Sequence, residues 1–341
     1  MIGLLSSSLL AADSNAPPDM LQRMAMFGLQ NRLIQELNWK ALREVVTRLE
    51  AIDIGVVTFK GVTAEARWYD QQGERPSSDV DVLVQPNAVG RAQEVIAALE
   101  PENEMIPHIG KLVESGIAES LAVRLPDGVT IDVHFRLLEV GLPLQQRQEV
   151  WARTVDHPHP DGGSVRVLDP ETALIHLLLH LNKDRFARLL WYADVARLLR
   201  VEQNLDWDYI DRFVRTEGLE APFYLSLDAV LSDLRIESPY GTIPAGWRAL
   251  LWRRLWGPGT RLEGEVGLER RQHRQRFLSL MFKGRKRQAL WWWFRKLFPP
   301  DPMLRWRYPW AKGPYAWRVA LTRVPGAWNA IRSEWNSWRS G

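Results

Sequence analysis

The chain contains no cysteine. Disulfide bonds, thiolate zinc sites, iron–sulfur clusters and cysteine nucleophiles are therefore excluded. The sequence also contains no Gly-rich phosphate loop of the P-loop or dinucleotide type, and no nucleophilic serine motif. The lack of cysteine does not fix the cellular compartment, because such a chain folds equally well in oxidising and in reducing surroundings.

Long uncharged apolar runs are missing as well. No segment approaches the roughly 18 residues that a membrane-spanning helix requires. The N-terminal segment MIGLLSSSLLAA is apolar and small, but no Lys or Arg precedes it, as a secretory signal peptide would need. We therefore expect a cytoplasmic protein, with attachment to a membrane surface left open.

Charge is divided unevenly along the 341 residues, although the net charge is only +3. Residues 241–341 hold 21 Lys and Arg against 5 Asp and Glu, a net charge of +16, and the first 240 residues carry −13. Seventeen tryptophans are present, and they are concentrated late in the chain. An acidic front and a basic, tryptophan-rich rear indicate two physical tasks.

Hydrophobic periodicity predicts an α+β domain followed by a helical one, with the boundary between Leu138 and Asp169. Asp79–Val84 alternates acidic and aliphatic residues, which is typical of a strand with two distinct faces. Asp169 and Pro170 suit the N-cap and first position of a helix. We expect helices near 17–52, 62–69, 88–99, 144–151, 170–182, 185–201, 207–216, 222–234 and 246–256, and strands near 54–59, 79–84, 117–125, 129–135 and 164–168.

Acidic residues on two predicted strands are the main candidates for chemistry. In an extended strand Asp79 and Asp81 point to the same face, roughly 7 Å apart, because side chains alternate. Two such carboxylates repel each other unless a cation lies between them, and Mg²⁺ takes oxygen ligands and bridges to phosphates. If the strand with Asp132 lies beside this one, three carboxylates converge and a two-metal site can form. The simpler alternative is a strand edge with solvated acids.

The segments FKG, RPSSDVDVLV and IDVHFRL, in that order, together resemble the uncharacterised nucleotidyltransferase family of bacteria, a branch of the polymerase-β-like nucleotidyltransferase superfamily. The later segment HLLLHLNKDRFARLLWYADVARLL is similar to the helical part of that family. The resemblance covers about Leu33 to Leu199. It implies a small mixed β-sheet nucleotidyltransferase core with flanking helices, followed by a mostly helical region. We accordingly divide the chain into an N-terminal helical segment (1–52), a catalytic core (53–150), a helical domain (151–260) and a basic, Trp-rich C-terminal region (261–341).

The resemblance also implies roles for single residues. Asp79, Asp81 and Asp132 would be catalytic and would bind Mg²⁺ or Mn²⁺, and Asp132 would help to deprotonate an acceptor hydroxyl. The nucleotide would be bound by Lys60, Gly61, Arg75 and His134. Lys60 and the Gly61 backbone would face the phosphates at a strand-to-helix turn, Arg75 would neutralise the β- and γ-phosphates, and His134 would orient Asp132 or meet the substrate.

The implied reaction transfers a nucleoside monophosphate, most simply AMP from ATP, to a hydroxyl on a protein, small molecule or glycan precursor. One departure from the superfamily concerns the turn Lys60-Gly61-Val62, where Gly-Ser or Gly-Gly is expected and no hydroxyl is available. This departure favours an alternative: a catalytically degenerate scaffold protein of the same fold. The three acids favour the enzyme.

Other polar residues have two interpretations each. His176 and His180 lie four apart on a predicted helix and could bind a metal, but packing in a core or cleft is the simpler interpretation. His157 and His159 alternate with prolines and suit a turn. Asp194 suits pairing on a helix surface, with a position in the cleft near the acceptor as the alternative.

The basic rear combines arginines with a tryptophan stripe. Trp317, Leu321, Val324, Trp328, Ile331, Trp335 and Trp338 recur at helical spacings. The stripe could dock on the acidic front domain. It could instead lie at a membrane interface, through residues 291–338, or bind a nucleic acid. We rank nucleic acid lowest, because no RNA-binding signature is present.

Overall fold

The computed structural model describes residues 17–100, 106–114, 118–138, 147–184, 186 and 188–240. The helices of this part are α2 (Pro18–Glu50), α3 (Gly61–Trp68), α4 (Val89–Leu99), α5 (Ile109–Glu114), α6 (Arg147–Ala152), α7 (Pro170–Lys183), α8 (Leu189–Val201), α9 (Trp207–Glu217) and α10 (Glu220–Leu234), with short 3₁₀ turns at Pro86–Ala88 and Ile106–His108. The strands are β1 (Val56–Thr58), β2 (Asp79–Val84), β3 (Ser120–Arg124), β4 (Thr130–His134), β5 (Val155–Pro158) and β6 (Ser164–Val167).

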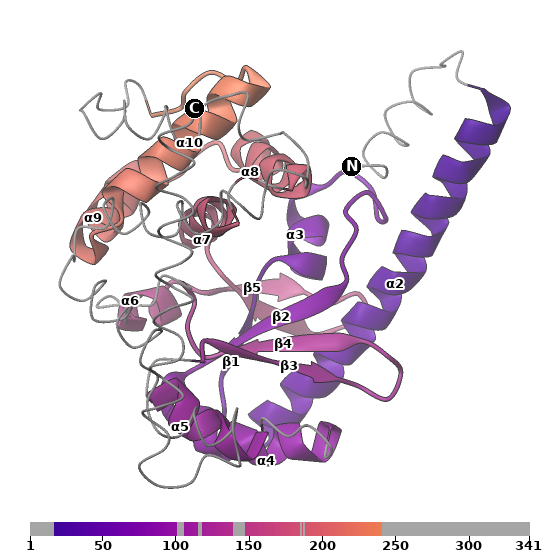
Figure 1. The fold of residues 1–341 in the computed structure, drawn as a ribbon, viewed down its shortest axis with the longest axis vertical. Coiled ribbons are helices and arrows are strands. Elements are labelled where there is room, and N and C mark those ends of the chain that lie inside the picture. The colour runs from indigo at the N-terminus through magenta and orange to yellow at the C-terminus, as the bar shows by residue number, and fades with distance from the viewer. Residues whose placement is uncertain are drawn as a thin grey trace, which may run out of the picture.

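The six strands form one mixed sheet in the order β3-β4-β2-β1-β6-β5. The pairs β2·β4 and β1·β6 are parallel, and the other three pairs are antiparallel. Helices lie on both sides of this sheet, with α4 and α5 on one side and α7 to α10 on the other (Figure 1). The prediction of a mixed α+β fold with flanking helices is confirmed.

Alternation in β2 divides its side chains between the two faces of the sheet. Val80, Val82 and Val84 are buried in a core that the sheet shares with α2, α4 and α5. Asp81 and Leu83 point to the opposite face, because successive side chains of a strand alternate. The acidic residues therefore face the helical layer of α7 to α10.

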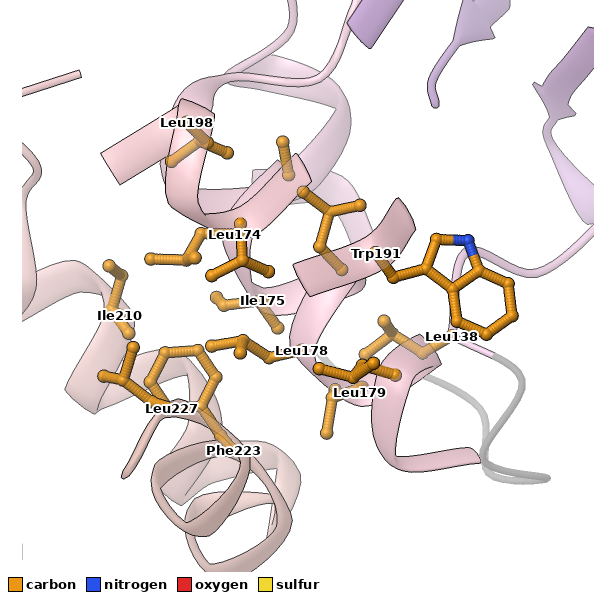
Figure 2. Close-up of a cluster of buried hydrophobic side chains, with 14 of the residues drawn as sticks. Leu138, Leu174, Ile175, Leu178, Leu179, Trp191, Leu198, Ile210, Phe223 and Leu227 are labelled. Carbon is orange, nitrogen blue, oxygen red and sulfur yellow. The ribbon is translucent and has the colours of Figure 1, made fainter. Parts of the chain in front are cut away.

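The second core fixes that helical layer against the sheet. Leu174, Ile175 and Leu178 of α7 pack toward Ile210 of α9 and Phe223 of α10, as Figure 2 shows. The α7 helix begins at Pro170, as predicted, but the side chain of Asp169 makes no capping hydrogen bond. Its Oδ2 instead accepts a hydrogen bond from Arg153 Nε at 2.7 Å.

The segment around the two prolines after α6 differs from the prediction. We expected His157 and His159 to lie in a turn, whereas His157 is part of β5 and pairs with Val165 of β6. His159 is buried, and its Nε2 lies 3.2 Å from the carbonyl oxygen of Trp39. The strand was missed because β5 is short and mostly exposed, so it lacks the alternation that the prediction used. The sheet therefore includes two strands that follow α6, and the second of them, β6, ends at Val167.

Several expectations fall outside the described residues. The helix at 246–256, the region 261–341 and the Trp-rich stretch 291–338 all lie there, so the three interpretations of the basic rear stay predictions. No helix in the part of the chain that the structure describes combines the length and hydropathy needed to cross a membrane.

Candidate functional site

The register of β2 and β4 brings two carboxylates together. Asp81 is the direct partner of Asp132 in this parallel pair, so both side chains leave the sheet on the same face. His134 follows two residues later on β4 and points to that face as well. Carboxylate oxygens of Asp81 and Asp132 and a ring nitrogen of His134 lie within 4.8 Å of one another. The expectation that Asp81 and Asp132 converge is therefore met.

Cationic side chains hold the two carboxylates in place. His134 Nε2 lies 2.9 Å from Asp81 Oδ1 and 3.2 Å from Asp132 Oδ2. Lys60 Nζ donates a hydrogen bond to the same Asp81 Oδ1 at 3.2 Å. Asp81 is 6% exposed, while a quarter of the Asp132 side chain is exposed. The group thus forms a half-open site on the sheet face.

The pKa values reflect this pairing. Burial favours the neutral carboxyl of Asp81, but the Lys60 ammonium and the hydrogen bond from His134 outweigh it, so the pKa of Asp81 lies well below its usual range. The pKa of Asp132 is also lowered, because the hydrogen bond from His134 outweighs its burial. Burial favours neutral His134, yet its hydrogen bonds to Asp132 and Asp81 raise its pKa. The two carboxylates are therefore ionised, and the Lys60 ammonium balances part of their charge.

These residues fit a divalent cation. Asp132 Oδ1 is buried and has no hydrogen-bond partner among the described residues, so this oxygen is an acceptor that a cation could satisfy. The two carboxylates are oxygen ligands of the kind that Mg²⁺ and Mn²⁺ take, whereas an imidazole is a ligand better suited to Zn²⁺, Fe²⁺ or Ni²⁺. His134 has to give up its proton to take part, since only the neutral ring binds a metal.

Asp79 lies at the margin of this group. It pairs with Thr130 in the same register, but its carboxylate is not among the atoms within 4.8 Å. Ser78 Oγ lies 3.3 Å from Asp79 Oδ1. Burial and the neighbouring charge of Asp81 raise the pKa of Asp79. The predicted metal ligation by Asp79 stays a prediction, and the third member of the group is His134.

The turn from β1 to α3 has a backbone that glycine normally provides. Lys60 has φ 60° and ψ −155°, a region that residues with a side chain rarely enter, and Gly61 follows with φ 44°. A Cβ on Gly61 would lie 3.1 Å from Ser77 Oγ and 3.2 Å from the Asp79 carbonyl oxygen. The turn therefore packs against the start of β2, and it places the Lys60 ammonium beside Asp81.

Arg75 and Asp194 form a buried ion pair that the sequence did not reveal. Arg75 Nε and Nη2 donate to Asp194 Oδ1 and Oδ2, both at 2.8 Å. Asp194 is completely buried, so its predicted place on a helix surface is wrong. The predicted phosphate contact of Arg75 stays a prediction. Its third nitrogen, Nη1, lies 3.4 Å from the carbonyl oxygen of Pro76.

The two histidines of α7 lie next to the site but outside the metal-binding group. His176 is buried against Phe59 and donates a hydrogen bond from Nδ1 to the Leu137 carbonyl at 2.9 Å. His180 stacks on His176 with ring centroids 5.7 Å apart. Burial lowers the pKa of His180 to about 3. The interpretation of this pair as packing residues is therefore supported.

Residues 1–230 match the sequence profile of the uncharacterised nucleotidyltransferase family. The chain belongs to this family. Among curated proteins no significant match was found. Membership of the family and the Asp81–Asp132–His134 group together support a nucleotidyltransferase that uses a divalent metal.

Proposed function

We propose that the protein is a Mg²⁺- or Mn²⁺-dependent enzyme that transfers a nucleoside monophosphate, most simply AMP from ATP, to a hydroxyl acceptor. The observation that carries this proposal is the pairing of Asp81 with Asp132 across β2 and β4, with His134 within the same 4.8 Å. In this family, such a group suits the positioning and charge neutralisation that dominate phosphoryl chemistry.

The reaction forms one bond and breaks one bond. The acceptor hydroxyl oxygen attacks the α-phosphorus of the triphosphate, the bond from that phosphorus to the bridging oxygen breaks, and pyrophosphate leaves. We assign uptake of the hydroxyl proton to Asp132, because its carboxylate is more exposed than that of Asp81. Bound Mg²⁺ or Mn²⁺ would supply Lewis-acid charge at the phosphates and at the hydroxyl.

Lys60 and Gly61 are the residues that we assign to the phosphates. The Lys60 ammonium lies 3.2 Å from Asp81 Oδ1, and so at the site itself. The backbone N–H groups at the first turn of α3 begin at Gly61 and favour an anion. The Thr63 hydroxyl is engaged within the turn, since its Oγ1 donates to the Lys60 carbonyl oxygen at 2.9 Å. We therefore assign to the Lys60 ammonium the phosphate contact that a serine makes elsewhere in the superfamily.

Metal binding is tested first, by titrating the full chain with Mn²⁺ in a calorimeter. Asp81→Asn and Asp132→Asn each remove one proposed ligand. Both should lower the Mn²⁺ affinity by more than the roughly 10–100-fold that loss of an outer-shell partner costs. Asp53→Asn is the matched control, since Asp53 is exposed with φ 57°, a conformation that Asn readily adopts. Its affinity should equal that of the wild type.

Nucleotide chemistry is tested next with ATP, GTP, CTP and UTP in the presence of Mn²⁺. The wild type should bind at least one triphosphate and release pyrophosphate, and neither acidic variant should release it. If none of the four triphosphates binds at millimolar concentration while Mn²⁺ binds, the enzyme proposal is wrong. The alternative of a degenerate scaffold protein is then favoured.

A further inference from the structure

The loop between α3 and β2 determines where the acidic strand begins. It runs from Tyr69 to Ser78, and Asp79 follows it directly. A displacement at the end of this loop would shift Asp81 relative to Asp132, because the two acids meet through strand register. The contacts that hold the loop therefore bear on the geometry of the site.

Side chains of two helices hold the backbone of this loop. Glu65 Oε1, on α3, accepts hydrogen bonds from the N–H groups of Gly73 and Arg75, both at 2.9 Å. On α2, Gln35 Nε2 donates to the Arg75 carbonyl at 2.7 Å, and Asn31 Nδ2 donates to the Gly73 carbonyl at 3.1 Å. The backbone of Arg75 is thus bonded at both its N–H and its carbonyl.

The side chain of Arg75 extends the restraint to the helical layer. Its guanidinium forms the two-pronged pair with Asp194 of α8, and the side chains are 4% and 0% exposed. Tyr69 Oη, at the other end of the loop, donates to Asp194 Oδ1 at 2.6 Å. Asp194 therefore bonds the first residue of the loop and also Arg75, which lies four residues before Asp79.

Such a pair is a costly way to gain stability. Removing two charges from water offsets most of their attraction, and well-packed apolar residues in their place are often equally stable or more stable. The pair instead fixes the relative orientation of the two side chains, because a planar guanidinium and a carboxylate form their two hydrogen bonds in one geometry.

We propose that Asp194 is a positioning residue that fixes, through Arg75, the start of β2, so that Asp81 meets Asp132 at the distance a divalent cation needs. The inference rests on the proposed function, because it assumes that this group binds a metal. Asp194 belongs to the helical layer, and its hydrogen bonds go to Tyr69 and Arg75 rather than to the proposed metal ligands. The inference therefore gives a residue outside the metal-binding group a role in its geometry.

The test measures Mn²⁺ affinity by calorimetry and by the electron paramagnetic resonance signal of free Mn²⁺, at a temperature where each variant is folded. Asp194→Asn keeps the size of the side chain and Arg75→Lys keeps its charge, but both lose the two-pronged pair. We expect each to weaken Mn²⁺ binding by about 10-fold, the lower range for loss of an outer-shell partner. The unfolding midpoint of each variant is recorded separately.

An exposed pair between the same loop and the same helix provides the matched control. Asp70 bonds to Arg197 and to Arg200 of α8 at the protein surface. Asp70→Asn removes these contacts without touching the buried pair. It should leave Mn²⁺ affinity within twofold of the wild type.

A double variant separates positioning from stability. Arg75→Met with Asp194→Leu removes both charges, so it should fold even if Asp194→Asn does not. If Asp194 positions the site, this double variant binds Mn²⁺ about 10-fold more weakly although its stability is near that of the wild type. Wild-type affinity in the double variant and in Arg75→Lys would overturn the inference alone. If the wild type does not bind Mn²⁺, both the proposed metal site and this inference are wrong.

Discussion

Removal of the Lys60 ammonium should reveal a competition between that cation and a metal. Lys60 Nζ and Asp81 Oδ1 are 3.2 Å apart, and their side chains are 10% and 7% exposed. At this distance, two unit charges attract by about 5 kcal/mol with an effective dielectric constant of 20. The net effect is smaller, because His134 still pairs with Asp81 after the ammonium is removed.

Lys60→Met keeps the apolar stem of the side chain and loses the charge. We expect the free energy of unfolding of the metal-free protein to fall by about 3 kcal/mol, the lower end for breaking a buried pair. Mn²⁺ should bind the variant more tightly than the wild type, because no ammonium occupies Asp81 Oδ1. Triphosphate binding in the presence of Mn²⁺ should weaken.

The measurements are urea unfolding in a chelator, followed by calorimetric titration with Mn²⁺ and then with ATP. A comparison of Lys60→Ala with Lys60→Gly isolates the backbone, because both remove the side chain and only glycine relieves φ 60°. The glycine variant should be about 1–3 kcal/mol more stable than the alanine variant. An unchanged unfolding free energy together with unchanged Mn²⁺ affinity in Lys60→Met would refute the reasoning.

Two further predictions concern neighbouring residues. Burial raises the pKa of Glu65 to about 7, and the negative charge of Glu74 acts in the same direction. The hydrogen bonds from the backbone N–H groups and the charge of Arg75 lower it, but by less. The folded protein then retains a proton that the unfolded chain releases, so stability falls as pH rises from 4.5 to 7. Glu65→Gln should flatten this part of a thermal unfolding profile, and a wild-type slope would contradict the shift. Gly61→Ala should cost about 1–2 kcal/mol in urea unfolding because of its positive φ, whereas Gly90→Ala in α4, where a Cβ meets nothing within 4 Å, should stabilise by about 0.5–1 kcal/mol. Equal effects of the two glycine changes would show that the turn is not restrained.

The strands that carry the candidate site could be predicted from the sequence. Asp79–Val84 shows alternation so regular that its bounds and its two faces follow from the residue pattern. The Asp-Gly pair at 127–128, between two strand-like runs, is a hairpin signal that predicts the strand with Asp132 in the same way. Their side-by-side pairing was only a condition in the sequence argument, because register depends on contacts between distant segments.

What could not be predicted depends on long-range partners. Asp194 looked like one of several charged residues on an amphipathic helix, and only the position of Arg75, 119 residues earlier, explains its burial. His134 was expected to orient Asp132 or to meet the substrate, and its contact with Asp81 Oδ1 appears only when β2 and β4 are adjacent. The spacing Asp-x-His was the one available signal, since it places both side chains on one face.

The pairing of β2 with β4 also limits how the length of this chain can vary. A single residue inserted within either strand would turn its acids toward the valine core and its valines toward the helices. Two inserted residues would return each side chain to its original face of the sheet, but Asp132 would then lie two positions away from Asp81 in the strand register. Length changes are therefore compatible with the site only outside these strands, for example at the exposed tip around Asp127 and Gly128, where homologues of differing length are expected to diverge.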